Sequence, residues 1–178
     1  MPWPATNCQL GGPCPLGRNP GDRRGSPARL IAQNAAPADI DELRKGPTVK
    51  LDDDLLALLR KPSICFLATS MADGSPQVTQ TWVDTDGEHV IINSVQTHVK
   101  VRNIERDPRV AAAIADPDDP SHYYQVRGRV IEVSTDGGPE HIDMLSQKYH
   151  GTPHPWYGGR DQVRVVLTIE ADSVSGTG

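Results

Sequence analysis

The residues best suited to binding a ligand lie in a short basic run at residues 97–103, THVKVRN. Thr97 has the side chain of a good N-cap, so we expect it to begin a helix that ends before Pro108. The free N–H groups at a helix N-terminus attract anions, and Lys100 adds an ammonium near the first turn. The run therefore predicts an anion site that suits the phosphodiester of a phosphorylated cofactor.

Helical spacing divides this basic run between two faces. His98 and Arg102 share one face, which Arg106 continues, whereas Lys100 and Asn103 share another. Such a stripe can bind a polyanionic tail, against the acidic trend of the rest of the chain. The alternative is a solvated helix face with ordinary basic residues, and spacing alone favours that alternative.

A second polar pattern lies in a predicted strand at residues 77–83. Alternation places Gln77, Thr79 and Thr81 on one face and Gln80 on the other, together with Val78 and Trp82. Polar side chains of this kind can bond the carbonyl and nitrogen atoms of a planar ring and so orient a cofactor. The residues alone make a solvent-exposed strand face an equally good interpretation.

The histidine and aromatic residues near the C-terminus are weaker candidates. His150 and His154 have a metal-like spacing, but Pro153 precludes a regular helix between them, and we expect no metal site. Trp156 and Tyr157 can wall a pocket or cap the barrel, and capping is the simpler interpretation.

Length and composition limit the function classes. The chain has 178 residues, a net charge of −5 and an odd number of cysteines, Cys8, Cys14 and Cys65. These features fit one domain, give no support to nucleic-acid binding and make a disulfide scaffold unfavourable. No apolar stretch approaches the ~18 residues of a membrane span, and we recognise no secretory signal. We therefore expect a cytoplasmic protein without nucleic-acid or membrane partners.

The first 46 residues differ from the rest. They carry six basic and four acidic residues and seven of the 16 prolines, whereas residues 47–178 carry twelve basic and nineteen acidic residues. No sustained apolar period runs through the first segment, so it cannot bury enough surface to offset the entropy of ordering. We expect residues 1–46 to be a disordered or loosely docked extension before a cofactor-binding domain at 47–178.

Hydrophobic periodicity and turn residues predict the elements of this domain. Leu51, Leu55, Leu58 and Leu59 form one face of a short helix, which Pro62 ends. Two more helices are expected at 97–107 and 138–150, and six strands at 63–70, 77–83, 89–94, 109–115, 122–134 and 162–171. This pattern predicts a mainly β fold, a six-stranded antiparallel barrel with flanking helices. Its own side chains fill such a barrel, so a ligand must bind in a surface groove or at a subunit interface.

Two segments carry a resemblance to a known family. They are DGSPQVT at residues 73–79 and KVRN, followed by DPRV, between residues 100 and 110. In their order and separation the chain resembles the pyridoxamine-phosphate-oxidase-like split β-barrel superfamily over residues 51–175. More narrowly, it is similar to the deazaflavin-dependent branch, flavin/deazaflavin oxidoreductase group B, found largely in actinobacteria.

The resemblance implies a homodimer with two cofactor sites at its interface. It implies F420 as the cofactor, with FMN or haem in other branches. The residues that match the family's cofactor contacts fall in two groups, Gln77, Thr79 and Gln80 beside the ring, and Thr97, His98, Lys100, Arg102 and Asn103 around the anionic part. Trp156 is not followed by the Arg-x-His signature of a vitamin B6 oxidase, so we do not expect that activity.

These expectations combine into an F420H2-dependent reductase that transfers a hydride to an electron-poor double bond of a small organic or tetrapyrrole substrate. The proton comes from solvent or from an acid such as Tyr123, His122 or His154, and the sequence does not choose among them. The alternative is a non-catalytic protein of the same fold that binds or carries F420, FMN or haem. Both need the same cofactor contacts, and the substrate is not predicted.

Overall fold

The computed structural model describes residues 48–177. The expected extension at 1–46 lies outside the described residues and stays a prediction. The described elements, in chain order, are α2 (Asp53–Arg60), β1 (Ile64–Ser70), β2 (Pro76–Thr81), β3 (Val83–Thr85), β4 (Val90–Val95), α3 (Val99–Arg106), β5 (Arg109–Ala115), β6 (Tyr123–Ser134), α4 (Gly138–His150) and β7 (Arg164–Gly176). Within them, none of the helices has the length and apolar character that a membrane crossing requires.

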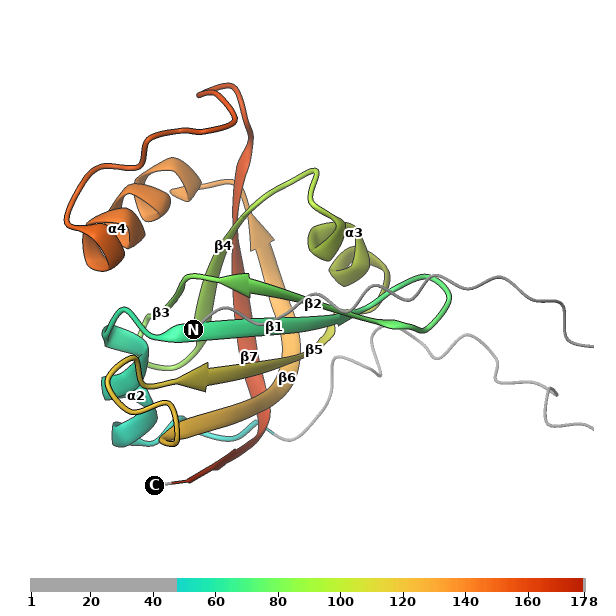
Figure 1. The fold of residues 1–178 in the computed structure, drawn as a ribbon. Coiled ribbons are helices and arrows are strands. Elements are labelled where there is room, and N and C mark those ends of the chain that lie inside the picture. The colour runs from blue at the N-terminus through green and yellow to red at the C-terminus, as the bar shows by residue number, and fades with distance from the viewer. Residues whose placement is uncertain (1–47, 178) are drawn as a thin grey trace, which may run out of the picture. The chain divides into compact units, whose positions relative to one another are not determined.

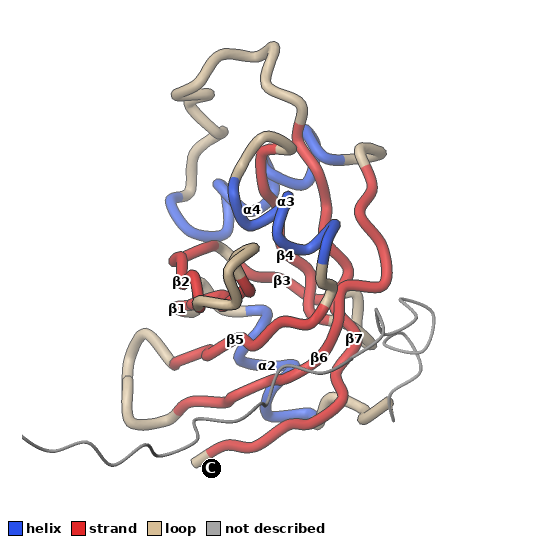
Figure 2. Tube along the Cα trace, turned by 90° about the vertical axis from the view of Figure 1, so that its right-hand side faces the viewer, coloured by secondary structure: helices blue, strands red, loops and turns tan. Residues whose placement is uncertain are grey.

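Seven strands form one antiparallel sheet in the order β2-β1-β5-β6-β7-β4-β3. The sheet curls into a half-barrel, with α3 and α4 beyond one end of it in both views (Figures 1 and 2). Bulges in the β6–β7 pair help the sheet bend, as bulges do elsewhere. At one of them a Cβ on Gly128 would lie 2.0 Å from the carbonyl oxygen of Glu170, so only glycine lets the strands approach there.

The prediction of six strands is wrong by one, because the expected strand at 77–83 is two strands. β2 pairs with β1, whereas β3 pairs with β4, and these pairs lie at opposite edges of the sheet. Only Trp82 separates β2 from β3. A single residue spans a few ångströms, so the chain itself brings the two edges of the sheet together at Trp82.

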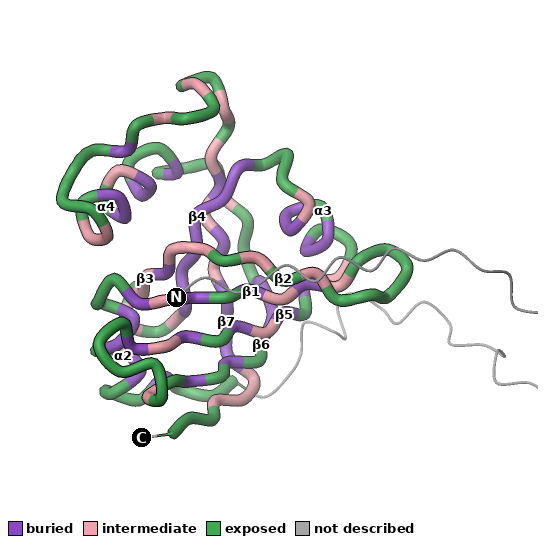
Figure 3. The backbone as a smooth tube through the Cα atoms, in the orientation of Figure 1, coloured by how far each residue is buried: buried purple, intermediate pink, exposed green. Residues whose placement is uncertain are grey.

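The interior of the curled sheet is filled by its own side chains and by one face of α2. Asp52 caps this helix, because its carboxylate accepts the Leu55 N–H at 2.7 Å. Leu55, Leu58 and Leu59 are buried as the spacing predicts. They join a core whose largest fully buried strand residues are Leu67, Ile92, Ile114, Leu167 and Ile169. Buried positions accordingly run along β4 and β7 in Figure 3.

The remaining helices lie outside this core. α3 packs on β1, and α4 packs on β7 and β4. The prediction that Thr97 is the N-cap of α3 is wrong: His98 occupies that position, without a side-chain capping bond. The His98 N–H is instead donated to the Val95 carbonyl at 2.9 Å, which closes a tight turn at the end of β4 and delays the start of the helix.

The bounds of two predicted elements are confirmed. Strand 109–115 and helix 138–150 have the expected bounds, and the remaining elements are shifted by a few residues at their ends. Cys65 is fully buried, and burial raises its thiol pKa to about 12. Of the two tyrosines that open β6, Tyr124 faces the core and Tyr123 is exposed.

Candidate functional site

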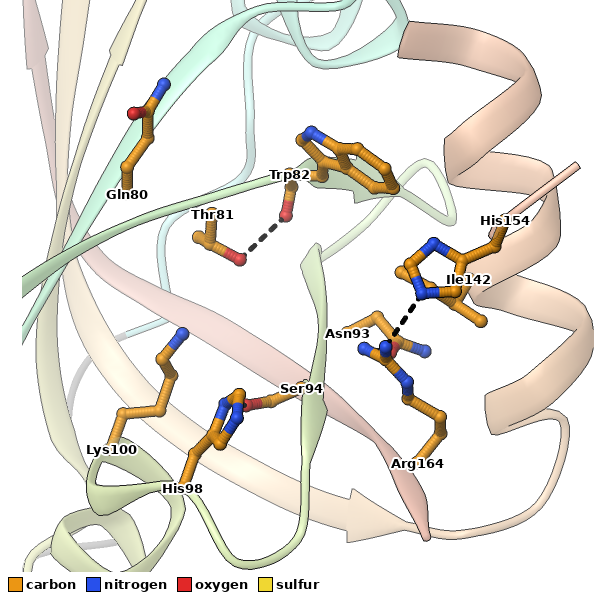
Figure 4. A pocket seen from close by; sticks show the side chains of 10 residues that line it. All are labelled: Gln80, Thr81, Trp82, Asn93, Ser94, His98, Lys100, Ile142, His154 and Arg164. Atoms are coloured by element: carbon orange, nitrogen blue, oxygen red, sulfur yellow. Dashed lines mark hydrogen bonds between the residues drawn. The ribbon is translucent and has the colours of Figure 1, made fainter. Parts of the chain in front are cut away.

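A pocket of about 410 Å³ opens beside the point where the chain crosses from β2 to β3. Its walls come from β2, β4, α3, α4, β7 and connecting residues between elements, which bring together residues far apart in the sequence. The lining residues are Gln80, Thr81, Trp82, Asn93, Ser94, His98, Lys100, Ile142, His154 and Arg164. Figure 4 shows Lys100 and His98 at one end and His154 and Arg164 at the other, with Asn93 and Ser94 between them.

Lys100 is the second residue of α3 and is only 9% exposed. The alternative of a solvated helix face is therefore wrong for Lys100, because α3 packs this side of the helix on β1. Burial lowers the pKa of its ammonium, and among residues 48–177 no carboxylate lies within ion-pair distance of it. A buried cation without a counter-charge is costly, and an anionic ligand would relieve that cost.

Arg164 begins β7 at the other end of the pocket. Its guanidinium donates to His154 Nε2 at 2.9 Å and lies 3.5 Å from Asn93 Oδ1. Because Arg164 can only donate, His154 Nε2 must accept, and the ring proton of the neutral imidazole is then on Nδ1. That Nδ1 is buried and has no hydrogen-bond partner in the described part of the chain.

The pocket is electropositive although the domain around it is acidic. Burial lowers the pKa of His98, and the nearby charges of Lys100 and Arg164 lower it further. Burial and the charge of Arg164 likewise lower the pKa of His154, although Asp143 acts in the opposite direction. Both histidines are therefore held toward the neutral form, and Lys100 and Arg164 dominate the field in the pocket.

A cluster of aromatic rings lies behind one wall of the pocket, and of these rings Trp82 and His154 line it. The Trp82 indole stacks on Tyr149 of α4 at 5.2 Å between centroids, and the edges of His150 and His154 approach it. His154 also contacts Trp156 and Tyr157 of the loop after α4, and Arg160 and Arg164 lie over the Trp156 ring. This arrangement gives the pocket an apolar, planar surface beside the charge of Arg164.

Four of the residues expected to hold the cofactor or supply a proton line this pocket: Gln80, His98, Lys100 and His154. Asn103 does not, because it is buried one turn further along α3. Its amide donates to Thr69 Oγ1 at 3.0 Å and to Gln77 Oε1 at 3.1 Å. Asn103 and Gln77 thereby tie α3 to the β1–β2 hairpin and position Lys100 without themselves lining the pocket.

The other predicted residues lie elsewhere in the described structure. Thr97 lines a smaller pocket of about 200 Å³ with residues 161–163, and Arg102 is exposed on the outer side of α3. The hydroxyl of Thr79 is buried in β2 and has no partner within residues 48–177. Tyr123 and His122 lie at the start of β6, where His122 faces Asp116 and the Tyr123 N–H faces Thr177, and neither lines the 410 Å³ pocket.

Sequence reasoning missed six of the ten lining residues: Trp82 and Thr81 at the strand crossing, Asn93 and Ser94 on β4, Ile142 and Arg164. Only Arg164 carried a signal, as the single charge inside the apolar run VRVVLTI. Asn93 and Ser94 were hidden inside a strand that reads as ordinary β sequence. The position of the Asn93 side chain depends on α4, whose Gly138 carbonyl accepts the Asn93 amide at 2.8 Å.

The chain belongs to the pyridoxamine 5'-phosphate oxidase family, whose model matches residues 51–177. Among solved structures, an F420 reductase is 30% identical with a TM-score of 0.62, and the match covers 70% of this chain and 98% of that chain. A conserved hypothetical protein from Mycobacterium tuberculosis shares the fold at 22% identity and a TM-score of 0.57, over 75% of this chain and 88% of that one. A protein of unknown function from Agrobacterium tumefaciens shares the fold at 19% identity and a TM-score of 0.56, over 75% of this chain and 60% of that chain.

Proposed function

We propose that the protein is an F420H2-dependent reductase that uses the 410 Å³ pocket to hold the cofactor against a small, electron-poor substrate. The observation that carries this proposal is Lys100, a buried ammonium that faces a pocket and has no carboxylate partner within residues 48–177. The 30% identity to an F420 reductase over nearly all of that chain supports the choice of cofactor. FMN is the alternative within the same fold.

The residues present fit a phosphorylated, planar cofactor. Lys100, with the neighbouring N–H groups at the start of α3, would hold its phosphodiester, and Arg102 is placed to meet only a tail that extends outward. His98 and Ser94, whose side chains are 3.4 Å apart, offer further polar contacts. Gln80, Thr81 and the Trp82 indole would lie against the ring system.

When bound, reduced F420 supplies a hydride, which adds to one carbon of an electron-poor double bond, while a proton adds to the other. The protein's own task is to orient the two molecules and to keep water from the reacting face. Of the three candidate proton donors, His154 alone lines the pocket. Its Nε2 accepts a hydrogen bond from Arg164, so the ring is neutral and is a poor proton donor. This arrangement favours solvent as the source of the proton.

We further propose that the protein acts as a homodimer. The outer face of β2, β1 and β5 is apolar and exposed, with Phe66 at 44% and Val78 at 59%. Phe66 lies opposite Gln80 on β2 and Ala113 on β5, so the patch reaches the strand that lines the pocket. Exposed apolar patches of this kind are typical of interfaces, and a second copy here would complete the walls of the cofactor site.

The test is to add F420, FMN and haemin separately to the purified protein and to follow the spectrum of each. We expect F420 to bind most tightly, and we expect the protein to oxidise F420H2 when an acceptor panel of quinones, unsaturated lactones and tetrapyrroles is added. Tight F420 binding without turnover on any acceptor would favour the carrier alternative. Preference for FMN or haemin over F420 would contradict the proposal.

A further inference from the structure

The end of the pocket beside α4 contains a second cation, Arg164, which is not among the residues proposed to bind the cofactor. Arg164 lies at the far end of the lining from Lys100 (Figure 4). Within the described residues, no carboxylate lies within ion-pair distance of its guanidinium, and its Nε is buried without a partner. Burial alone lowers its pKa, with no acidic group to raise it again. Arginine nevertheless stays charged in proteins, so this is a standing, uncompensated positive charge.

The side chains around Arg164 hold it in place rather than neutralise it. His154, 8% exposed, accepts from one terminal nitrogen, and Asn93, 6% exposed, faces the other. Asn93 is itself fixed by the bond from its amide to the Gly138 carbonyl. A Cβ on Gly138 would lie 2.6 Å from the Arg164 carbonyl oxygen, so glycine here lets the start of α4 sit directly against the start of β7. The guanidinium is therefore preorganised, and preorganised donors lose little entropy on binding.

The surface next to this charge is apolar and planar. The Trp82 indole and the Ile142 side chain line the same part of the pocket. Trp156 is not part of the lining, but its ring lies against the Arg164 guanidinium at 5.9 Å and supports it. A ligand that uses the lining has a flat carbon skeleton with one carboxylate. The guanidinium fork matches a carboxylate with two parallel bonds, while Trp82 and Ile142 cover the skeleton.

We propose that Arg164, held by His154 and Asn93, is the carboxylate-binding residue of the substrate subsite, and that the substrate is a flat, conjugated carboxylate. That this ligand is the substrate rests on the proposed function. The carboxylate site itself is argued from Arg164 and its surroundings alone. Lys100 and Arg164 then divide the pocket between two anions, one from the cofactor and one from the substrate.

The experiment compares two probes of the same shape, 2-naphthoate and its neutral amide 2-naphthamide, by calorimetry on the full chain. Each is titrated without cofactor and again with saturating oxidised F420. A charge-assisted bidentate contact predicts that the parent binds the carboxylate at least about 10-fold more tightly than the amide in both conditions. Equal affinity for the two probes would overturn the proposal.

Variants locate the effect. Arg164→Gln should abolish the preference for the carboxylate, and Arg164→Lys should retain part of it because the charge remains. Arg160→Gln is the matched control, since it removes the same charge from an exposed position over the Trp156 ring that does not line the pocket. It should keep the full preference. A preference that survives Arg164→Gln, or that Arg160→Gln abolishes equally, would overturn the assignment.

F420 affinity measured on the same variants separates this proposal from the proposed function. We expect Arg164→Gln to change F420 affinity by less than about 3-fold, well under the effect of removing a direct charged contact. If Arg164→Gln weakens the binding of F420 as much as the binding of naphthoate, Arg164 is part of the cofactor site and the proposed substrate subsite is wrong. If the parent binds naphthoate selectively but not F420, the proposed function fails while the carboxylate site stands.

Discussion

Trp82 stacks on Tyr149 with ring centroids 5.2 Å apart and an interplanar angle of 17°. Trp82 is the one residue between β2 and β3, so α4 holds the point at which the two edges of the sheet meet. The Tyr149 hydroxyl strengthens the hold, because it donates to the Ser63 carbonyl at 2.7 Å and accepts the Val83 N–H at 3.1 Å. The wall of the pocket and the closure of the sheet therefore depend on the same contact.

Removing that hydroxyl should destabilise the fold. Tyr149→Phe keeps the stacking but leaves the Ser63 carbonyl and the Val83 N–H without their partner, which costs about 1–3 kcal/mol of unfolding free energy. Tyr157→Phe is the control, since Tyr157 is 89% exposed and should change stability by less than about 0.5 kcal/mol. Urea denaturation of both variants measures the difference. Equal stability of Tyr149→Phe and the parent would show that the hydrogen bonds of the Tyr149 hydroxyl do not stabilise the fold.

Stability should fall as the solution becomes mildly acidic. Burial lowers the folded-state pKa of His98 and of His154 below the ordinary 6.5. The unfolded chain then binds these protons more readily than the folded chain, so unfolding free energy is lost as pH falls through about 6.5. The melting temperature should be lower at about pH 5.5 than at about pH 7.5, and His98→Gln should reduce that difference. A His98→Gln variant with the parent's pH dependence would contradict this account of His98.

The dimer proposal predicts a particle of twice the 19.3 kDa chain mass in light scattering at micromolar concentration. Phe66→Glu places a charge in the apolar patch and should weaken self-association by at least about 10-fold, because an unpaired charge is costly to bury. Met144→Glu, at another exposed apolar position on α4, should leave it unchanged. A parent protein that is monomeric and still binds F420 would rule out the shared site.

The expected extension at residues 1–46 should be dispensable. A chain that starts at Thr48 retains every residue of the pocket and of the core. We expect its free energy of unfolding, measured by urea denaturation, to agree with that of the full chain within about 0.5 kcal/mol. We also expect it to bind F420 with the same affinity. A loss of about 1 kcal/mol or more, or weaker cofactor binding, would assign a role to the first segment.

Local pattern was enough to predict most elements of this fold. The Leu55–Leu58–Leu59 face of α2 and the helix at 138–150 are properties of short stretches, and the structure retains them. The break at Trp82 was different. Residues 77–83 contain no glycine, proline or other turn residue that would mark a break, and only the pairing of β2 with β1 and of β3 with β4 divides them. Such long-range pairing has no local signature.

The site was predictable to the extent that it lies on one short helix. Helical spacing correctly put Lys100 and Asn103 on one face, but it could not tell that this face is buried while Arg102 is exposed. That outcome depends on how α3 packs against β1, which the helix sequence alone does not contain. Arg164 and Asn93 reach the pocket from strands that are far apart in the chain, so sequence spacing could not bring them together.

The most direct test of the central claim is the affinity of F420 for Lys100→Gln, measured by spectroscopic titration beside the parent and Arg102→Gln. Lys100 lines the pocket, whereas Arg102 lies two residues along the same helix and is exposed. Loss of a charge-assisted contact to the phosphodiester predicts that Lys100→Gln weakens F420 binding by about 10- to 150-fold, while Arg102→Gln changes it by less than about 3-fold. A folded Lys100→Gln variant that binds F420 as tightly as the parent would contradict the claim that this pocket holds the cofactor.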